Sequence, residues 1–219
     1  MIFRIASVLD EPELRALTDL AAGQVFEPGA RTAGWSARTV KDNEQLTRGP
    51  AATAVSRTVE AALRRNDVFV AAAQPKTFCR TMLSRYEQGM SYGAHIDDAL
   101  IAGIRADLSF TLFLSPPDSY EGGELVLDTP DGETSLKLDE GDLVLYPTTF
   151  LHRVEEVQSG TRLVCVGWIR SLIRLQAHRE ILFDLETAAR TVFASEGKSP
   201  LFDRLSRSKS NLLRLWAED

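Results

Sequence analysis

Apolar residues recur at helical spacing in two stretches near the N-terminus of the chain. In the first, between residues 10 and 21, leucine or alanine returns every three or four positions, and Asp10 has the capping-box spacing to Glu13. The second stretch begins at Pro50, a residue suited to the first turn of a helix, and ends near Asn66. The pattern therefore predicts two amphipathic helices joined by a glycine-bearing loop.

The pattern changes from about residue 68 to short apolar segments separated by glycine and proline turns. Residues 107–112 alternate polar and apolar positions, which is typical of a strand with one buried face. A Pro-Asp-Gly sequence at 130–132 lies between two further segments and has the chemistry of a hairpin turn. Strands are also expected at 143–146 and 161–169. Many short strands at close spacing predict an antiparallel sandwich or barrel of the jelly-roll kind.

Helical spacing returns after Arg170, where isoleucine and leucine recur through two stretches up to residue 215. The chain is thus expected to be mainly β with flanking helices. We predict an N-terminal helical region at 1–67 that packs on the core, a jelly-roll β core at 68–170 and a C-terminal helical extension at 171–219.

Composition narrows the class of protein. Of the 219 residues, 44% are hydrophobic and 26% are charged, which is ordinary for a globular domain with a core. The net charge of −6 argues against nucleic acid as the partner, because phosphate binding normally requires a basic surface. No apolar run is long enough to span a bilayer, so no membrane partner is expected. Cys79 and Cys165 lie far apart, which favours a reducing, cytoplasmic location.

Two of the three histidines and one aspartate have the types and spacing of a metal site. His95 and Asp97 are two positions apart, so in extended chain both side chains lie on the same side of the backbone. His152 follows the segment that ends at Pro147, where a jelly roll can bring it beside the first pair. Two imidazoles and one carboxylate hold one face of a ferrous ion and leave its other positions open for chemistry. These three residues are therefore candidate catalytic iron ligands.

Histidine and aspartate at this spacing also occur without a bound iron. A His-x-Asp pair is a weak motif by itself, and satisfied core or surface histidines would produce it too. Zinc accepts the same ligand types, so the residues alone do not exclude it. His178 lies among polar neighbours in a predicted helix, which indicates a solvated face, and we assign it no role.

An arginine on the last predicted strand bears on the chemistry of this site. Arg162 alternates with valine and tryptophan on an apolar face that is expected to point into the barrel. A buried guanidinium keeps its charge and needs an anion, supplied either by an internal salt bridge or by a bound ligand. The second case predicts a bidentate pair with the distal carboxylate of 2-oxoglutarate. Tyr86, on an earlier strand, either donates its hydroxyl to the same carboxylate or serves only in packing.

Further short motifs accompany these candidates along the chain. Within the β core they are Arg85-Tyr86, His95-Ile96-Asp97, Asp107 to Leu114, Tyr120 to Leu125, Tyr146-Pro147, Leu151 to Val154 and Gly160-Thr161-Arg162. Outside it they are Thr32-Ala33-Gly34, Val40 to Leu46 and Asn211 to Ala217. Together these motifs resemble the bacterial PKHD-type hydroxylases, in the prolyl 4-hydroxylase-like branch of the iron and 2-oxoglutarate dioxygenases. Two positions depart from that pattern, because Asp98 replaces an expected Asn and Phe150 replaces a small polar residue.

The resemblance implies a double-stranded β-helix with His95, Asp97 and His152 as iron ligands and Arg162 as the 2-oxoglutarate anchor. It implies an Fe(II)- and 2-oxoglutarate-dependent dioxygenase that hydroxylates a substrate with dioxygen and releases succinate and carbon dioxide. It also implies L-ascorbate as a cofactor, because in such families ascorbate rescues iron that has been oxidised without turnover.

The substrate and the assembly do not follow from these residues. A small molecule, a siderophore and a peptide side chain all remain open as substrates, and a homo-oligomer is compatible with the sequence. The rival hypothesis is a non-catalytic, cupin-like module that binds or senses a metal or ligand and does not consume 2-oxoglutarate. A nucleic-acid demethylating oxygenase is disfavoured by the net acidity and by the lack of a basic stripe with interleaved aromatic residues.

Overall fold

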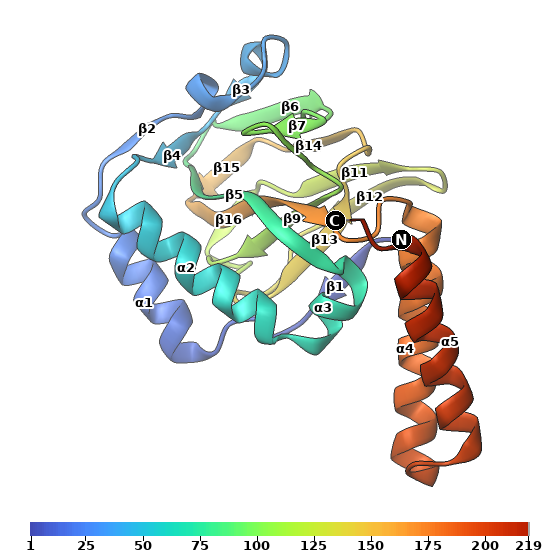
Figure 1. The fold of residues 1–219 in the computed structure, drawn as a ribbon. Coiled ribbons are helices and arrows are strands. Elements are labelled where there is room, and N and C mark those ends of the chain that lie inside the picture. Colours follow the sequence, from blue (N-terminus) through green and yellow to red (C-terminus); the bar gives the residue numbers. More distant parts are fainter. Residues whose placement is uncertain (219) are drawn as a thin grey trace.

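Two antiparallel sheets form the centre of the structure, a computed structural model that describes residues 1–218 (Figure 1). The strands of the larger sheet are β1 (Phe3–Ile5), β2 (Phe26–Pro28), β4 (Glu44–Leu46), β5 (Pro75–Tyr86), β9 (Leu108–Phe113), β13 (Leu143–Pro147) and β16 (Arg162–Ser171). Their order across the sheet is β1-β13-β9-β16-β5-β4-β2. Neighbouring strands that are far apart in sequence, such as β9 and β16, require crossovers between sheets, as in a jelly roll.

The smaller sheet supplies the opposite wall. Its strands are β3 (Lys41–Asp42), β6 (Ser91–His95), β11 (Leu125–Thr129), β12 (Gly132–Leu136) and β14 (His152–Val154), in the order β12-β11-β14-β6-β3. Two short pairs complete the β structure, namely β7 (Leu100–Ile101) with β8 (Ile104–Arg105) and β10 (Tyr120–Gly122) with β15 (Val157–Gly160).

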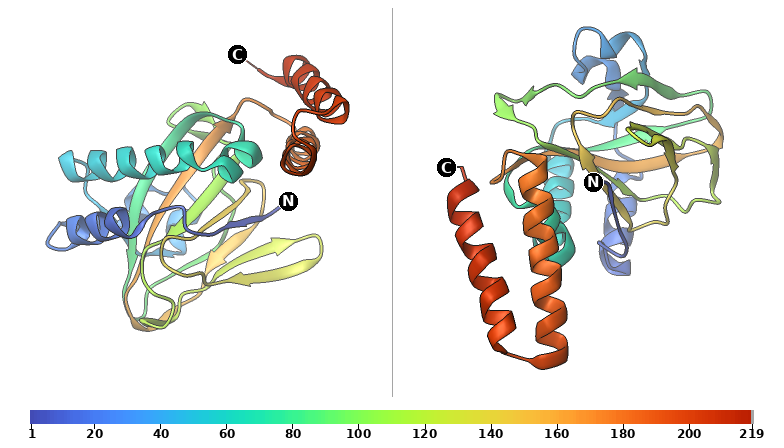
Figure 2. Two further views of the ribbon diagram at one scale, coloured as in Figure 1. Left: turned by 90° about the horizontal axis from the view of Figure 1, so that it is seen from below. Right: turned by 90° about the vertical axis from the view of Figure 1, so that its right-hand side faces the viewer.

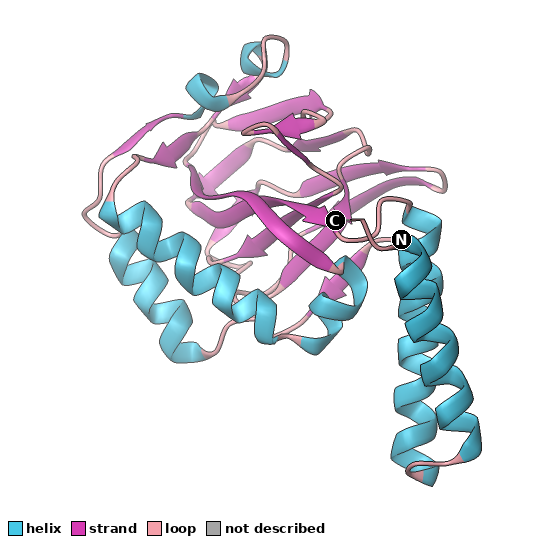
Figure 3. Cartoon of the chain, in the orientation of Figure 1, coloured by secondary structure: helices cyan, strands magenta, loops and turns pink. Residues whose placement is uncertain are grey.

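Helices lie outside the sheets, as Figure 3 shows. They are α1 (Glu11–Ala21), α2 (Pro50–Arg65), α3 (Asp67–Ala73), α4 (Gln176–Glu196) and α5 (Pro200–Trp216), with short 3-10 turns η1 (Gly29–Thr32) and η2 (Ala37–Thr39). The first three helices cover the outer face of the larger sheet, whereas α4 and α5 form a hairpin that extends away from the sheets (Figure 2). The prediction of a β core with flanking helices is confirmed.

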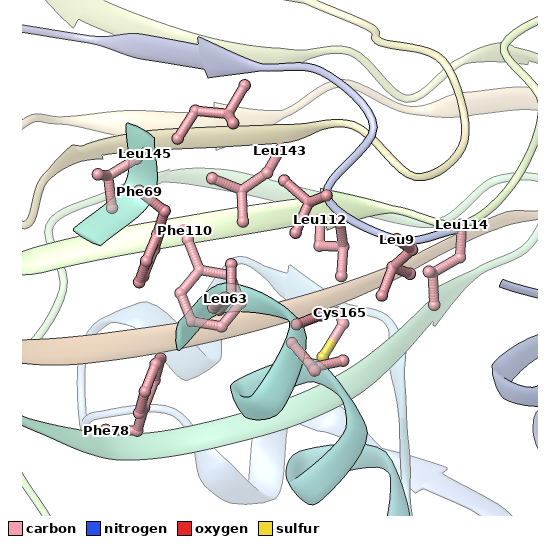
Figure 4. Packing of buried hydrophobic residues seen from close by; sticks show 14 of the residues in the cluster. Leu9, Leu63, Phe69, Phe78, Phe110, Leu112, Leu114, Leu143, Leu145 and Cys165 are labelled. Atoms are coloured by element: carbon pink, nitrogen blue, oxygen red, sulfur yellow. The ribbon is translucent and has the colours of Figure 1, made fainter. Parts of the chain in front are cut away.

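The alternation of β9 divides its residues between two cores. Leu108, Phe110 and Leu112 pack with residues of α1, α2 and α3 in a cluster that includes Leu63 and Phe69 (Figure 4). The intervening positions, which are Ser109, Thr111 and Phe113, face the space between the two sheets. All six residues are buried, because this central strand has a covering layer on both faces. The polar positions of the strand therefore mark the side on which a site can form.

Most of the elements that the pattern predicts are present. The helices expected at 10–21 and from Pro50 to Asn66 are α1 and α2, and α1 has the predicted capping box between Asp10 and Glu13. The hairpin expected around residues 130–132 is the β11–β12 pair.

Three expectations were wrong. Residues 67–73 form the helix α3 and not the start of the strands, which begin at Pro75. The N-terminal region is not only helical, because β1, β2, β3 and β4 add strands to both sheets. His178 is not on a solvated face in mid-helix; it lies in the first turn of α4, half-buried, with its ring stacked on Trp216 at a centroid distance of 3.9 Å.

Candidate metal centre

Three of the residues singled out from the sequence meet between the sheets. β6 and β14 are neighbouring strands of the smaller sheet, and His95 lies directly opposite His152 in their register. Asp97 follows the end of β6 by two residues, and one ligand atom from each of the three lies within 4.8 Å of the others. His95 Nε2 is 3.9 Å from Asp97 Oδ1, and His152 Nε2 is 3.8 Å from Asp97 Oδ2. Two nitrogens and a carboxylate thus converge on one point.

Backbone carbonyls orient both imidazoles. Nδ1 of His95 lies 2.9 Å from the carbonyl oxygen of Gly93, and Nδ1 of His152 lies 3.0 Å from that of Phe150. A carbonyl can only accept, so each Nδ1 carries the proton and each Nε2 presents a lone pair to the shared point. Burial, together with the neighbouring His152, lowers the pKa of His95 to about 4. The neutral imidazole is the form that binds a metal.

Ser109 of the larger sheet holds the carboxylate of Asp97 in place, and Tyr92 of β6 holds the ring of His95. Ser109 Oγ donates a hydrogen bond of 2.7 Å to Asp97 Oδ2. Tyr92 stacks on His95 at a centroid distance of 3.6 Å with the rings 16° apart. Hydrogen bonds of this kind to metal ligands fix their orientation and commonly raise metal affinity. Ser109 received no role from the sequence, although a small polar residue at an inward position of an apolar strand was the available signal.

Arg162 lies at the start of β16 and is 1% exposed. Its guanidinium lies over the rings of Tyr86 and Phe113, at 5.0 and 5.6 Å from their centroids. Its Nε and Nη2 are buried without a hydrogen-bond partner, and no carboxylate among residues 1–218 forms an ion pair with it. The internal salt bridge, which the sequence left open, is therefore absent from the described residues. Unpaired buried donors on a charged group are costly unless a ligand accepts from them.

Two tyrosines accompany Arg162. Tyr86 lies directly opposite it in the β5–β16 register and is buried, and burial raises the pKa of its phenol, so the hydroxyl stays protonated. Tyr120 on β10 also lies beside Arg162, and its buried hydroxyl has no partner either. Tyr120 begins one of the family-like motifs but received no role from the sequence. The three side chains together offer donors for an anion.

One cavity of about 210 Å³ connects the two groups of residues. His95, Asp97 and His152 line it together with Tyr86 and Arg162. Asp98, one of the two departures, lies on its wall against Gly34, whereas Phe150 contributes its carbonyl oxygen to His152 and is not part of the lining.

The residues present fit an iron ion and 2-oxoglutarate. The nitrogen and oxygen donors match the two-histidine, one-carboxylate set of non-haem iron sites. The orphaned donors of Arg162 match a carboxylate that arrives with a ligand, because a guanidinium binds a carboxylate through two parallel hydrogen bonds. An arrangement of this kind suits a metal ion and a dicarboxylate bound side by side.

Comparison with known proteins agrees with this geometry. The model of the 2OG-Fe(II) oxygenase superfamily matches residues 81–170. A PKHD-type hydroxylase of Parvibaculum lavamentivorans is 53% identical over 220 residues, and one of Crocosphaera subtropica is 51% identical over 222 residues; each match covers 100% of both chains.

Solved structures with low sequence identity share the fold. The crystal structure of a Pseudomonas putida prolyl-4-hydroxylase has a TM-score of 0.54 at 22% identity, covering 78% of this chain and 92% of that one. An oxidoreductase of the 2OG-Fe(II) oxygenase family from Burkholderia pseudomallei has a TM-score of 0.58 at 18% identity, covering 76% and 84%. From the full-length matches above, the chain belongs to the PKHD-type hydroxylases and is a 2-oxoglutarate-dependent iron dioxygenase.

Proposed function

We propose that this chain hydroxylates a substrate while 2-oxoglutarate is converted to succinate and carbon dioxide. In this proposal His95, Asp97 and His152 hold Fe(II), and Arg162 with Tyr86 holds the distal carboxylate of 2-oxoglutarate. The observation that carries it is the buried, unpaired guanidinium of Arg162 in the same cavity as the His-Asp-His group. A metal-binding module without a cosubstrate would have no use for that charge.

The chain's own residues would bind, orient and shield the reactants. Iron and 2-oxoglutarate, when bound, would supply the electrons that activate dioxygen, so that one oxygen atom enters a substrate C–H bond and the other enters succinate. Ser109 keeps Asp97 turned toward the metal position, and the carbonyls behind the two histidines keep their Nε2 atoms aimed there. Tyr86 keeps its proton and can donate to the cosubstrate carboxylate. The buried walls exclude water from the reacting groups.

The proposal also covers the reductant, the cellular location and the division of the chain into parts. L-ascorbate would serve as the reductant that restores oxidised iron. A cytoplasmic location is supported by two cysteines, Cys79 and Cys165, that are both free thiols. No α-helix in the described chain combines the length and the apolarity that crossing a membrane demands. A division into an N-terminal region, a β core with the metal ligands and a C-terminal helical extension is also proposed, with the start of the core moved from residue 68 to Pro75.

The first test is an anaerobic titration of metal-free protein with ferrous iron and then with 2-oxoglutarate, followed by visible absorption. We expect a weak charge-transfer band only when both are present, and its loss on admission of oxygen as succinate forms. Iron binding without any response to 2-oxoglutarate would instead support the cupin-like module.

Substitutions test the proposed metal ligands and the proposed cosubstrate anchor separately. Arg162→Ala should weaken 2-oxoglutarate binding at least a hundredfold, because it removes a charge-assisted bidentate pair, yet leave iron bound. His95→Ala and His152→Ala should each lose iron. Calorimetric titration of each variant with Fe(II) and with 2-oxoglutarate distinguishes these outcomes. An Arg162→Ala protein that binds 2-oxoglutarate as tightly as the parent would contradict the assignment of the anchor.

A further inference from the structure

Two further cations, Lys41 and Arg80, line the cavity at a distance from Arg162. Lys41 on β3 belongs to the smaller sheet and Arg80 on β5 to the larger one, and both lie in the cavity wall. Their charges are close enough for Arg80 to lower the pKa of Lys41. Among residues 1–218, neither makes an ion pair or a side-chain hydrogen bond to an acidic group. Two sheets thus bring together two cations without an acidic partner, the Lys41 ammonium lying 4.8 Å from the centroid of the Tyr92 ring.

The register of the larger sheet places Arg80 relative to the metal centre. Arg80 is directly opposite Trp168, Trp168 is directly opposite Ser109, and Ser109 bonds to the candidate ligand Asp97. Residues opposite one another in antiparallel strands project from the same face, so this row runs along the cavity wall to the metal position. Arg162 lies six residues from Trp168 along β16, which corresponds to about 20 Å of strand. A cosubstrate held by Arg162 therefore leaves the Arg80 end of the cavity free.

Trp168 adds a hydrogen-bond donor to the two cations. Its indole Nε1 is buried without a partner, and an indole N–H can only donate. The side chain lines the cavity beside Arg80. Burying such a donor is unfavourable unless a ligand atom accepts from it. The Arg80 end of the cavity thus combines two positive charges with a donor that has no acceptor among the described residues.

The negative charges of the proposed metal centre do not neutralise Lys41 and Arg80. The carboxylate of Asp97 favours the charged form of Lys41. In the loaded site, however, the positive charges of Fe(II) and Arg162 would offset the negative charges of Asp97 and 2-oxoglutarate. Asp98 is the remaining acidic residue of the cavity wall, and it forms no ion pair with Lys41 or Arg80 among the described residues. Burial lowers the pKa of Lys41 to about 8, so the ammonium is still charged at neutral pH. The loaded cavity would therefore keep a positive excess.

We propose that Lys41, Arg80 and the Trp168 indole bind an anionic group, a carboxylate or a phosphate, of the hydroxylated substrate. The inference rests on the proposed function, since it assigns a substrate class to the same cavity. It favours a small acidic molecule or one with a terminal oxyanion over a neutral one. The row from Arg80 to Ser109 spans two strand spacings, about 10 Å, so the anionic group and the oxidised carbon lie within one small molecule's length.

The test uses Mn(II) as a redox-inert, paramagnetic substitute for iron. Binding of Mn(II) and of 2-oxoglutarate is measured first for every variant, so that failure of the proposed function is seen separately. Inorganic phosphate is then titrated into protein saturated with 2-oxoglutarate, and its phosphorus relaxation is recorded; carbon-13 acetate is titrated in parallel. We expect the relaxation rate of each anion to increase and then to saturate as binding saturates. The anion that binds more tightly indicates whether the substrate carries a phosphate or a carboxylate.

Variants decide whether the enhancement arises at this site. Lys41→Met and Arg80→Met should each weaken apparent anion affinity about tenfold, because each removes one charge-assisted contact. Arg80→Lys should restore part of the anion affinity that Arg80→Met loses. Trp168→Phe removes only the indole N–H donor, so it tests the contribution of that donor separately. Arg57→Met, an exposed cation on α2 outside the cavity, is the matched control and should bind anions like the parent.

Two results would overturn the inference. One is an absence of saturable enhancement in protein that binds both Mn(II) and 2-oxoglutarate. The other is an enhancement that survives unchanged in Lys41→Met and Arg80→Met. If 2-oxoglutarate does not bind at all, the proposed function fails, and phosphate titrations of the protein with Mn(II) alone still test the anion site.

Discussion

A single glycine determines how closely the backbone approaches the proposed cosubstrate anchor. Gly123 has a φ of +67°, and a Cβ atom added there would lie 2.9 Å from Cδ of Arg162. The guanidinium is therefore seated against backbone that has no side chain. The Gly-Gly pair within the motif from Tyr120 to Leu125 thus has a physical reason, since a left-handed conformation and close packing both require glycine at this position.

Gly123→Ala should displace Arg162 and weaken 2-oxoglutarate binding about tenfold, through longer hydrogen bonds to its carboxylate, while metal binding is retained. The dissociation constant for 2-oxoglutarate, measured calorimetrically in the presence of Mn(II), checks this. Gly132→Ala is the control, because Gly132 also has a positive φ but has no atom within 4 Å of the added Cβ. Equal losses of affinity in the two variants would mean that backbone strain, and not contact with Arg162, is responsible.

The individual elements show why some parts of the fold could be predicted and others could not. Helices α1 and α2 have their own signals, namely a capping box, a proline in the first turn and a long apolar stripe. Helix α3 has seven residues, too few to show a helical period, and its run of valine, phenylalanine and alanine is equally compatible with a buried strand. Strands β2, β3 and β4 have two or three residues each and exist through pairing with distant partners.

The cap of α1 is a local device with a measurable contribution. Asp10 accepts a hydrogen bond of 2.9 Å from the backbone N–H of Glu13, and the Glu13 side chain accepts from the Asp10 N–H while also pairing with Arg65 at the end of α2. Asp10→Ala should lower the free energy of unfolding by about 1 kcal/mol. Urea unfolding measures it, and Asp19→Ala, an exposed position of the same helix, should stay within about 0.5 kcal/mol of the parent. Equal effects of the two substitutions would refute a specific role for the cap.

At the scale of the whole molecule, the site depends on pairings that no local pattern reveals. His95 and His152 meet because β6 and β14 pair across more than fifty residues of chain, and Ser109 reaches Asp97 from the other sheet. The sequence indicated the residue types and the strand ends, and the resemblance joined them into one site. Lys41 lies between the two expected N-terminal helices, in a stretch for which no strand was expected, so neither its strand nor its place in the cavity could be foreseen. The iron ligand set itself stays a prediction until metal binding is measured.

In the helical hairpin of α4 and α5, α4 packs on α3 and contacts it as far along as the ion pair between Arg190 and Asp67. α5 contains no fully buried residue and packs mainly on α4. After α5, Glu218 returns to the sheets: its carboxylate accepts from Arg105, its carbonyl accepts from Lys76 and its N–H donates to the Leu172 carbonyl. Figure 2 shows the far end of the hairpin extending into solvent. The contacts of Glu218 therefore act as a clamp on the end of an otherwise lightly packed helix.

Breaking that clamp should loosen α5 without affecting the catalytic cavity. In Glu218→Gln the ion pair with Arg105 is lost, so local opening of α5 becomes easier while the sheets keep their packing. Hydrogen exchange followed by mass spectrometry should show faster exchange confined to residues 200–216, with binding of Fe(II) and 2-oxoglutarate unchanged. Glu196→Gln, an exposed acid at the other end of the hairpin, is the matched control. If exchange also accelerates in β5 or β16, the clamp supports the barrel itself, and the hairpin is then an integral part of the catalytic fold.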